Sequence, residues 1–141
     1  MASPKQNHDR RRQAVEGSRR IVVKVGSRLL TDMADTPKQV RIEQLIRQLA
    51  AARNRGFEVV LVSSGAIAAG MMLTQAAKRP SHLPLLQGLA AIGQSRLMSL
   101  YETACQQHGF HCAQILLSWD DVKDRQRHLN VRNCINALLS N

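Results

Sequence analysis

Aromatic side chains are scarce in this sequence: two phenylalanines, one tyrosine and one tryptophan make up 3% of its 141 residues. The core must therefore be built mainly from aliphatic side chains. Hydrophobic residues reach 44% of the chain, which is normal for a globular protein. A chain of this length can bury the core of one domain without disulfides or structural metals.

Cysteines are also few, and their number is odd: Cys105, Cys112 and Cys134. The beginning of the chain has no apolar segment of the kind found in signal peptides. The longest apolar stretch, residues 59–73, is interrupted by two serines and two glycines, which makes it unsuited to span a bilayer. These absences predict a protein of the reducing cytoplasm with no membrane partner.

Acidic residues are outnumbered two to one by lysine and arginine, which gives a formal net charge of +10. Much of this charge lies in or next to residues 1–18, a polar segment that we expect to be a disordered basic tail. No aromatic residue lies between its arginines to stack on bases. We therefore favour a solvated tail over a nucleic-acid site, and any binding of polyanions there should be weak and salt-sensitive.

Residues 19–141 show the alternation of strands and helices that is typical of an α/β domain. Apolar runs at 21–25, 57–62 and 110–117 are expected to be buried strands. Helices are expected at 36–56, directly after residue 66, at 85–108, and from a cap at Ser118 to about the end of the sequence. This order predicts a three-layer αβα sandwich with a mostly parallel sheet. Gly88 and Gly93, inside a predicted helix, are expected where another backbone packs closely.

Two strand ends carry residues suited to bind anions. Lys24 is a charge inside an apolar strand, and a buried ammonium needs an anion; Gly26 then lets a ligand approach the backbone. Residues 63–66 combine two hydroxyls, a glycine and a helix N-terminus. Ligands bind beyond the carboxyl ends of parallel strands, so the pair favours phosphoryl transfer. Each segment also has a simpler interpretation when it is considered alone. Lys24 could be a lysine on an edge strand whose ammonium reaches water, and residues 63–66 could be an ordinary turn between a strand and a helix.

The other motifs in the sequence do not indicate a further binding or catalytic site. The sequence contains neither the P-loop pattern nor the dinucleotide-binding G-x-G-x-x-G pattern. Residues 105–112 hold two cysteines and two histidines, but strand alternation would point His111 and Cys112 to opposite faces, so we expect no metal site. The acidic residues of 120–124 suit helix N-termini better than an acid–base pair.

Four stretches resemble the amino acid kinase family, and within it the glutamate 5-kinase branch. They are IVVKVGS at 21–27, VLVSSGAIAAG at 60–70, AAIGQSRL at 90–97 and DRQRHLNVRN at 124–133. Other branches usually carry two glycines after the lysine of the first strand, whereas this sequence has Gly26 followed by Ser27. The resemblance implies ATP-dependent phosphorylation of the side-chain carboxylate of L-glutamate to glutamyl 5-phosphate, a step of proline synthesis. It also implies Mg²⁺ carried by the nucleotide, and a homo-oligomer at full length.

The resemblance also implies residue roles. Lys24 would be the catalytic group that neutralises the transferring phosphoryl group, and Gly26 and Ser27 would line the path of the ATP phosphates. The glutamate would be held by Ser64, Gly65 and Ala66. The family's domain continues to further glutamate-binding residues and a nucleotide-binding half, so the sandwich is expected to be incomplete and the chain not competent alone. The alternative is a non-catalytic remnant that binds glutamate or a kinase subunit.

Overall fold

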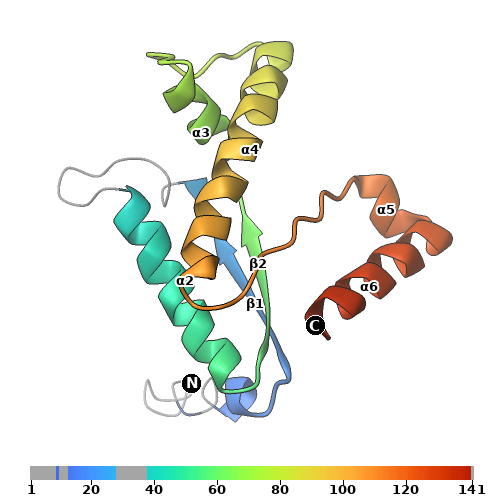
Figure 1. The fold of residues 1–141 in the computed structure, drawn as a ribbon. Coiled ribbons are helices and arrows are strands. Elements are labelled where there is room, and N and C mark those ends of the chain that lie inside the picture. Colours follow the sequence, from blue (N-terminus) through green and yellow to red (C-terminus); the bar gives the residue numbers. More distant parts are fainter. Residues whose placement is uncertain (1–8, 10–12, 28–37, 141) are drawn as a thin grey trace, which may run out of the picture.

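The computed structural model describes residues 9, 13–27 and 38–140 (Figure 1). Its elements, in chain order, are β1 (Arg20–Val25), α2 (Lys38–Asn54), β2 (Glu58–Ser63), α3 (Ala66–Leu73), α4 (Leu83–Gln106), α5 (Trp119–Lys123) and α6 (Arg125–Leu139). The first three predicted helices are confirmed within a few residues of their expected ends. The last one, expected as a single helix after Ser118, is divided into α5 and α6. The expected start of the first helix at residue 36 lies outside the described residues.

The described residues form one small sheet, in which β1 and β2 pair in parallel. Both strands are rich in β-branched residues, which suit a pleated surface. The crossover between them contains α2, as a parallel pair requires. The register places Lys24 opposite Val62 and Val25 opposite Ser63. Both strands therefore end at the same edge of the sheet.

The prediction of a third strand at residues 110–117 is wrong for this structure. The segment runs without sheet pairing from the end of α4 to α5 (Figure 1). A strand needs a neighbour for its backbone N–H and C=O groups. The N–H of Cys112 is instead bound by the Glu102 carboxylate at 2.9 Å, and Leu116 is 74% exposed. With two paired strands, the described chain is an α/β fold, and the three-layer sandwich stays a prediction.

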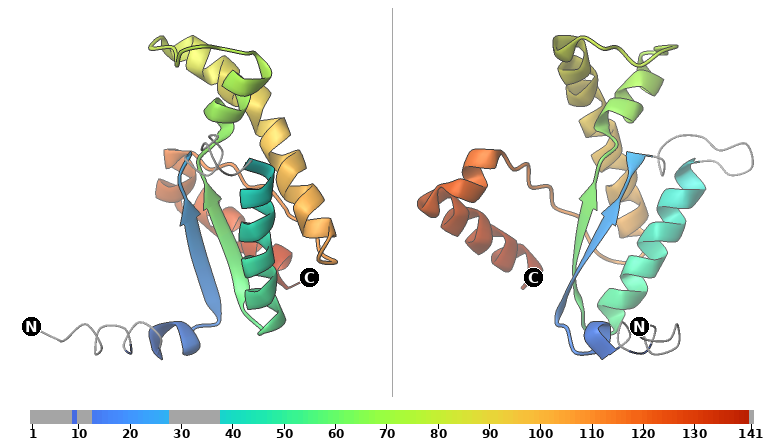
Figure 2. Two further views of the ribbon diagram at one scale, coloured as in Figure 1. Left: turned by 90° about the vertical axis from the view of Figure 1, so that its left-hand side faces the viewer. Right: turned by 180° about the vertical axis from the view of Figure 1, so that it is seen from behind.

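The core lies on one face of the sheet, where α2 and α4 pack (Figure 2). Strand alternation sends Val23 toward these helices and leaves Val22 exposed on the other face. The buried residues of the core cluster are Ile42, Ile46, Leu49, Leu97, Tyr101, Ala104 and Cys105. They lie at helical spacing on two elements, and each large aliphatic side chain among them contributes about 1.5–3 kcal/mol by burial.

Helices α3 and α4 cross at two glycines. A Cβ at Gly93 would lie 1.9 Å from the carbonyl oxygen of Ala66, and a Cβ at Gly70 would lie 1.9 Å from that of Leu89. The expected close approach of another backbone is therefore confirmed for Gly93. It is wrong for Gly88, where a Cβ would meet nothing within 4 Å.

Helices α5 and α6 lie on the side of the sheet opposite α2 and α4 (Figures 1 and 2). Neither contains a buried residue. A hydrogen bond joins α6 to β1: the guanidinium of Arg20 donates to Asn136 Oδ1 at 2.9 Å. The predicted start at Ser118 is confirmed, because Ser118 and Asp121 form a reciprocal capping box.

The amino-terminal segment is described only in part. Residues 13–16 form one helical turn, which the N–H of Gly17 closes on the carbonyl of Gln13 at 3.0 Å. The disordered tail over residues 1–18 therefore stays a prediction. Among the helices of the described residues, none combines the length and the apolar character that a membrane crossing needs.

Candidate functional site at the strand ends

The structure brings the two predicted anion-binding segments together. Val25 and Ser63 are opposite each other in the parallel register. One residue further on, the Ser64 hydroxyl donates to the carbonyl oxygen of Val25 at 3.3 Å. The end of β1 and the turn before α3 are thus joined directly. The chain leaves both strands at this edge, so backbone groups beyond the ladder are available for a ligand.

The first turn of α3 begins at this edge. Gly65 is the N-cap residue and is buried, and its carbonyl accepts the helical hydrogen bond from the N–H of Ala69 at 2.9 Å. No side chain caps this helix start. A helix start leaves its first N–H groups without intrahelical partners, and the helix dipole makes them favourable to an anion. Gly65 and Ala66 therefore suit the carboxylate role that the resemblance implies.

Ser63 is tied to α4. Its hydroxyl oxygen lies 2.7 Å from the hydroxyl oxygen of Tyr101, which is 5% exposed. Burial raises the pKa of Tyr101, so its phenol stays protonated. Sequence reasoning predicted the helix at 85–108 that carries Tyr101 but missed this contact. A signal was present, because a tyrosine in an apolar stripe needs a polar partner for its hydroxyl.

Lys24 occupies a different environment from the one expected. It is exposed and lies on the face of the sheet away from α2 and α4. The argument from a buried ammonium is therefore wrong, because alternation along β1 points Val23 to the core and Lys24 to solvent. What supports a role for Lys24 is its position at the end of β1. Gly26 and Ser27 follow it and are exposed, and a Cβ at Gly26 would meet nothing within 4 Å.

The histidine and cysteine residues near the end of α4 are organised by Glu102. Its carboxylate binds the backbone N–H of Cys112 at 2.9 Å and His111 Nδ1 at 2.5 Å. These hydrogen bonds lower the pKa of the Glu102 carboxyl to about 2, and the bond from the N–H of Cys112 has the largest effect. Burial raises the pKa of the Cys112 thiol to about 12. Across the described ranges there is no group of three or more histidine, cysteine, aspartate or glutamate side chains that could hold a metal ion.

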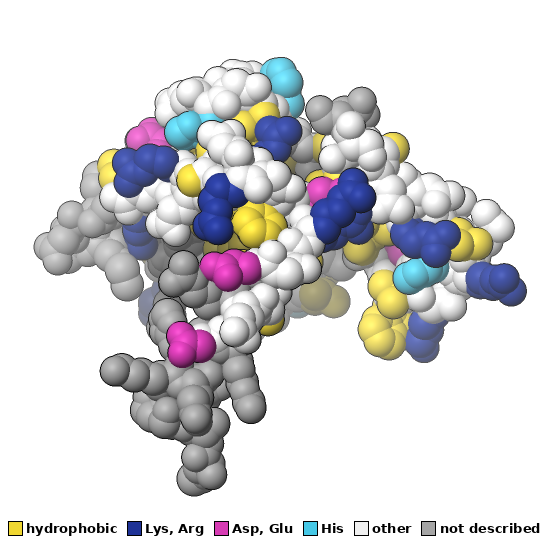
Figure 3. All heavy atoms as spheres, turned by 90° about the horizontal axis from the view of Figure 1, so that it is seen from below, with side chains coloured by type: hydrophobic (Ala, Val, Ile, Leu, Met, Phe, Trp, Pro, Cys, Tyr) yellow, Lys and Arg dark blue, Asp and Glu magenta, His cyan; other side chains and the backbone are white. Residues whose placement is uncertain are grey.

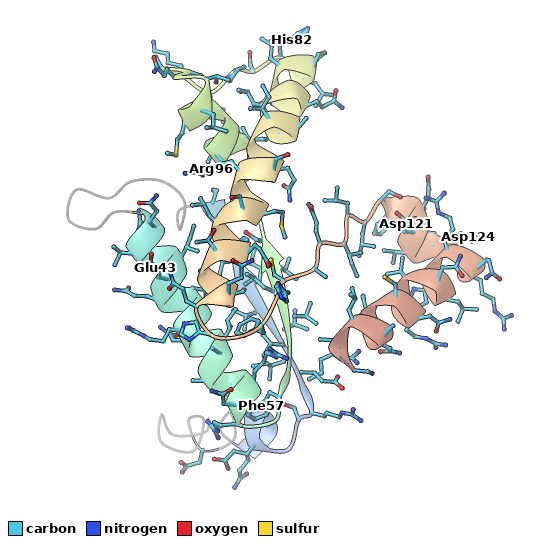
Figure 4. The ribbon with its side chains drawn as sticks, viewed as in Figure 1. Glu43, Phe57, His82, Arg96, Asp121 and Asp124 are labelled. Carbon is cyan, nitrogen blue, oxygen red and sulfur yellow. The ribbon has the colours of Figure 1, made fainter. Side chains whose placement is uncertain are left out.

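The acidic residues of 120–124 act as helix caps. Figure 4 shows Asp121 and Asp124 at the starts of α5 and α6, remote from the strand ends. Asp121 accepts from Ser118, and Asp124 Oδ1 accepts from the backbone N–H of Arg127 at 2.8 Å. These bonds support the capping interpretation over an acid–base pair.

Basic side chains form no single patch on the face seen in Figure 3. Lys and Arg side chains are spread over that face and are separated by polar and hydrophobic surface. Arg19 and Arg20 both pair with Glu58, at 2.9 and 2.8 Å. Arg127 pairs with Asp121 at 2.6 Å. Part of the positive charge is thus paired within the fold, which does not favour a nucleic-acid interface.

Comparison with known proteins defines the class. Residues 19–141 match the sequence model of the amino acid kinase family, and the chain belongs to that family. Similar curated proteins are named glutamate 5-kinase. Those of Aromatoleum aromaticum and Saccharophagus degradans are each 47% identical to this chain, and that of Azoarcus sp. is 46% identical, over 91% of the chain in every case. The chain spans about a third of the length of these relatives, 34%.

Proposed function

We propose that this chain forms the acceptor-substrate part of a kinase site that transfers the γ-phosphoryl group of ATP to the side-chain carboxylate of L-glutamate. One observation carries the proposal: the Ser64–Val25 hydrogen bond and the parallel register put the end of β1 beside the N-terminus of α3. A site for phosphoryl transfer needs positive or N–H groups at the transferring phosphate and at the acceptor. The names of the relatives support the acceptor class.

Each residue at the strand ends has a proposed role that follows from its position. The N–H groups at Gly65 and Ala66 bind the glutamate carboxylate, and the Ser64 hydroxyl joins them when it turns from the Val25 carbonyl to the ligand. One of its oxygens attacks the γ-phosphorus, the bond from that phosphorus to the ADP oxygen breaks, and no proton needs to move. Lys24 reduces the negative charge on the transferring group, and the turn at Gly26 and Ser27 faces the phosphates. The resemblance to the family implies Mg²⁺, which is expected to arrive with the nucleotide.

A binding measurement and an activity measurement test the proposal together. L-glutamate, added to the isotope-labelled chain, is expected to shift the amide signals of residues 64–66, whereas L-glutamine is not. Glutamate-dependent ATP turnover is then measured for the chain, for Lys24→Ala, and for Lys78→Ala, which changes an exposed lysine of the loop before α4. Turnover that Lys24→Ala alone abolishes supports the kinase. If neither binding nor turnover is found, the proposed function is wrong.

The second candidate is a non-catalytic remnant that binds glutamate or a kinase subunit. It needs the carboxylate-binding turn at residues 64–66 but does not need Lys24 or the turn at Gly26 and Ser27. Glutamate binding without any ATP turnover would support this candidate over the kinase. The cytoplasmic location and the homo-oligomeric state stay predictions of the sequence.

A further inference from the structure

The hydroxyl of Tyr101 is a polar group inside an apolar cluster. Tyr101 is packed with buried residues of α2 and α4, among them Ile42 and Leu97, and is 5% exposed. Burying a hydroxyl without a hydrogen bond is costly. The partner is the hydroxyl of Ser63, at 2.7 Å and 38 positions away in the sequence. A phenylalanine would fill the same apolar space, so the hydroxyl must be explained by what it holds.

Chemistry gives this hydrogen bond a direction. A phenol is a stronger acid than an aliphatic hydroxyl, and burial keeps the Tyr101 phenol protonated. Tyr101 is therefore the natural donor and Ser63 Oγ the acceptor.

Helix α4 holds the turn at residues 63–66 from two places. Gly93 packs against the carbonyl of Ala66 at the start of α3, and Tyr101 holds Ser63 at the end of β2. These two α4 residues are about 12 Å apart along the helix axis. The segment between the two contacts consists of Ser64 and Gly65, which carry the proposed carboxylate contacts.

We propose that Tyr101 is a positioning residue for the acceptor substrate. Its hydroxyl fixes Ser63, and thereby sets the position of Ser64 and Gly65 against the carboxylate of L-glutamate. This inference rests on the proposed function and deepens it, because it assigns part of the substrate affinity to a side chain that does not touch the substrate.

A double-mutant cycle on the full chain tests the inference. The affinity for L-glutamate is measured by NMR titration for the wild-type chain, Tyr101→Phe, Ser63→Ala and the double variant. The control is Thr103→Val on the same helix, which removes a hydroxyl that donates to the carbonyl of Ser99 at 2.9 Å. Tyr101→Phe is expected to weaken binding about 3- to 10-fold, the effect of losing one hydrogen bond. Thr103→Val is expected to leave the affinity unchanged.

The cycle separates positioning from a loss of folding. If Tyr101 acts through Ser63, then Tyr101→Phe has no further effect on affinity once Ser63→Ala is present. Equal weakening in both backgrounds, or wild-type affinity in Tyr101→Phe, overturns the inference and leaves the proposed function standing. A wild-type chain that does not bind L-glutamate overturns both. The folded state of each variant is checked by its amide spectrum before titration.

Discussion

Replacing Gly93 by alanine tests the close crossing of α3 and α4. The added Cβ would lie 1.9 Å from the carbonyl oxygen of Ala66 and 2.3 Å from the backbone nitrogen of Gly70. Both are backbone atoms, so no side chain can rotate out of the way. Helix α3 must move by about 1 Å for the first contact to reach 3.0 Å, the lower limit for real Cβ contacts. Overpacking of this kind costs about 1–3 kcal/mol.

Gly88 in the same helix supplies the control. A Cβ there would meet nothing within 4 Å, so Gly88→Ala gains only helix propensity, about 0.5–1 kcal/mol. Gly93→Ala gains the same propensity but loses more by overpacking. The free energies of unfolding of the two variants should therefore differ by about 1–3 kcal/mol. Urea titrations followed by circular dichroism measure this difference. Equal stability of the two variants would refute the close packing of these helices.

Two further predictions concern ionisable groups. The pKa of Glu102 is held at about 2, below its ordinary value of 4.5, by the N–H of Cys112 and then by His111. The stability that this carboxylate contributes is therefore complete above pH 4.5 and is lost as the pH falls toward 2. In Glu102→Gln, the free energy of unfolding should depend less on pH in that window. An unchanged slope of unfolding free energy against pH would contradict this account. Of the three thiols, Cys134 is exposed, Cys112 is partly buried and Cys105 is buried. A thiol reagent should therefore modify Cys134 first and Cys105 only in denaturant, and three equal rates would contradict this order.

Helix periodicity and strand alternation predicted the part of the fold that depends on local sequence. The spacing of Ile42, Ile46 and Leu49 predicted the buried face of α2, because such residues need only one neighbouring surface to cover them. The apolar run at 110–117 likewise predicts a buried strand from local sequence. Its assignment failed because a strand also needs a partner edge, which no local pattern can supply.

The candidate site was predictable in its position but not in its environment. Parallel strands bring their carboxyl ends together, so the meeting of Val25 with residues 63–64 followed from the fold class. The exposure of Lys24 did not follow, because sequence shows alternation but not which face the helices cover. The Tyr101–Ser63 bond joins residues 38 positions apart, and only the crossing of α4 over the strand ends determines it.

Because α4 contacts both ends of the turn at residues 63–66, the proposed site depends on the core. Gly93 and Tyr101 are part of the packing that holds α4 in place, and both contact the turn or the helix that follows it. A change that displaces α3 should therefore weaken L-glutamate binding even where no substrate contact is altered, since the N–H groups of Gly65 and Ala66 move with that helix. Gly93→Ala is the direct case: its amide signals for residues 64–66 should shift in the absence of ligand, and its affinity should fall below that of Gly88→Ala. If Gly93→Ala lowered stability but kept the affinity of Gly88→Ala, the turn would be held independently of the helix crossing, and Tyr101 would be its main support.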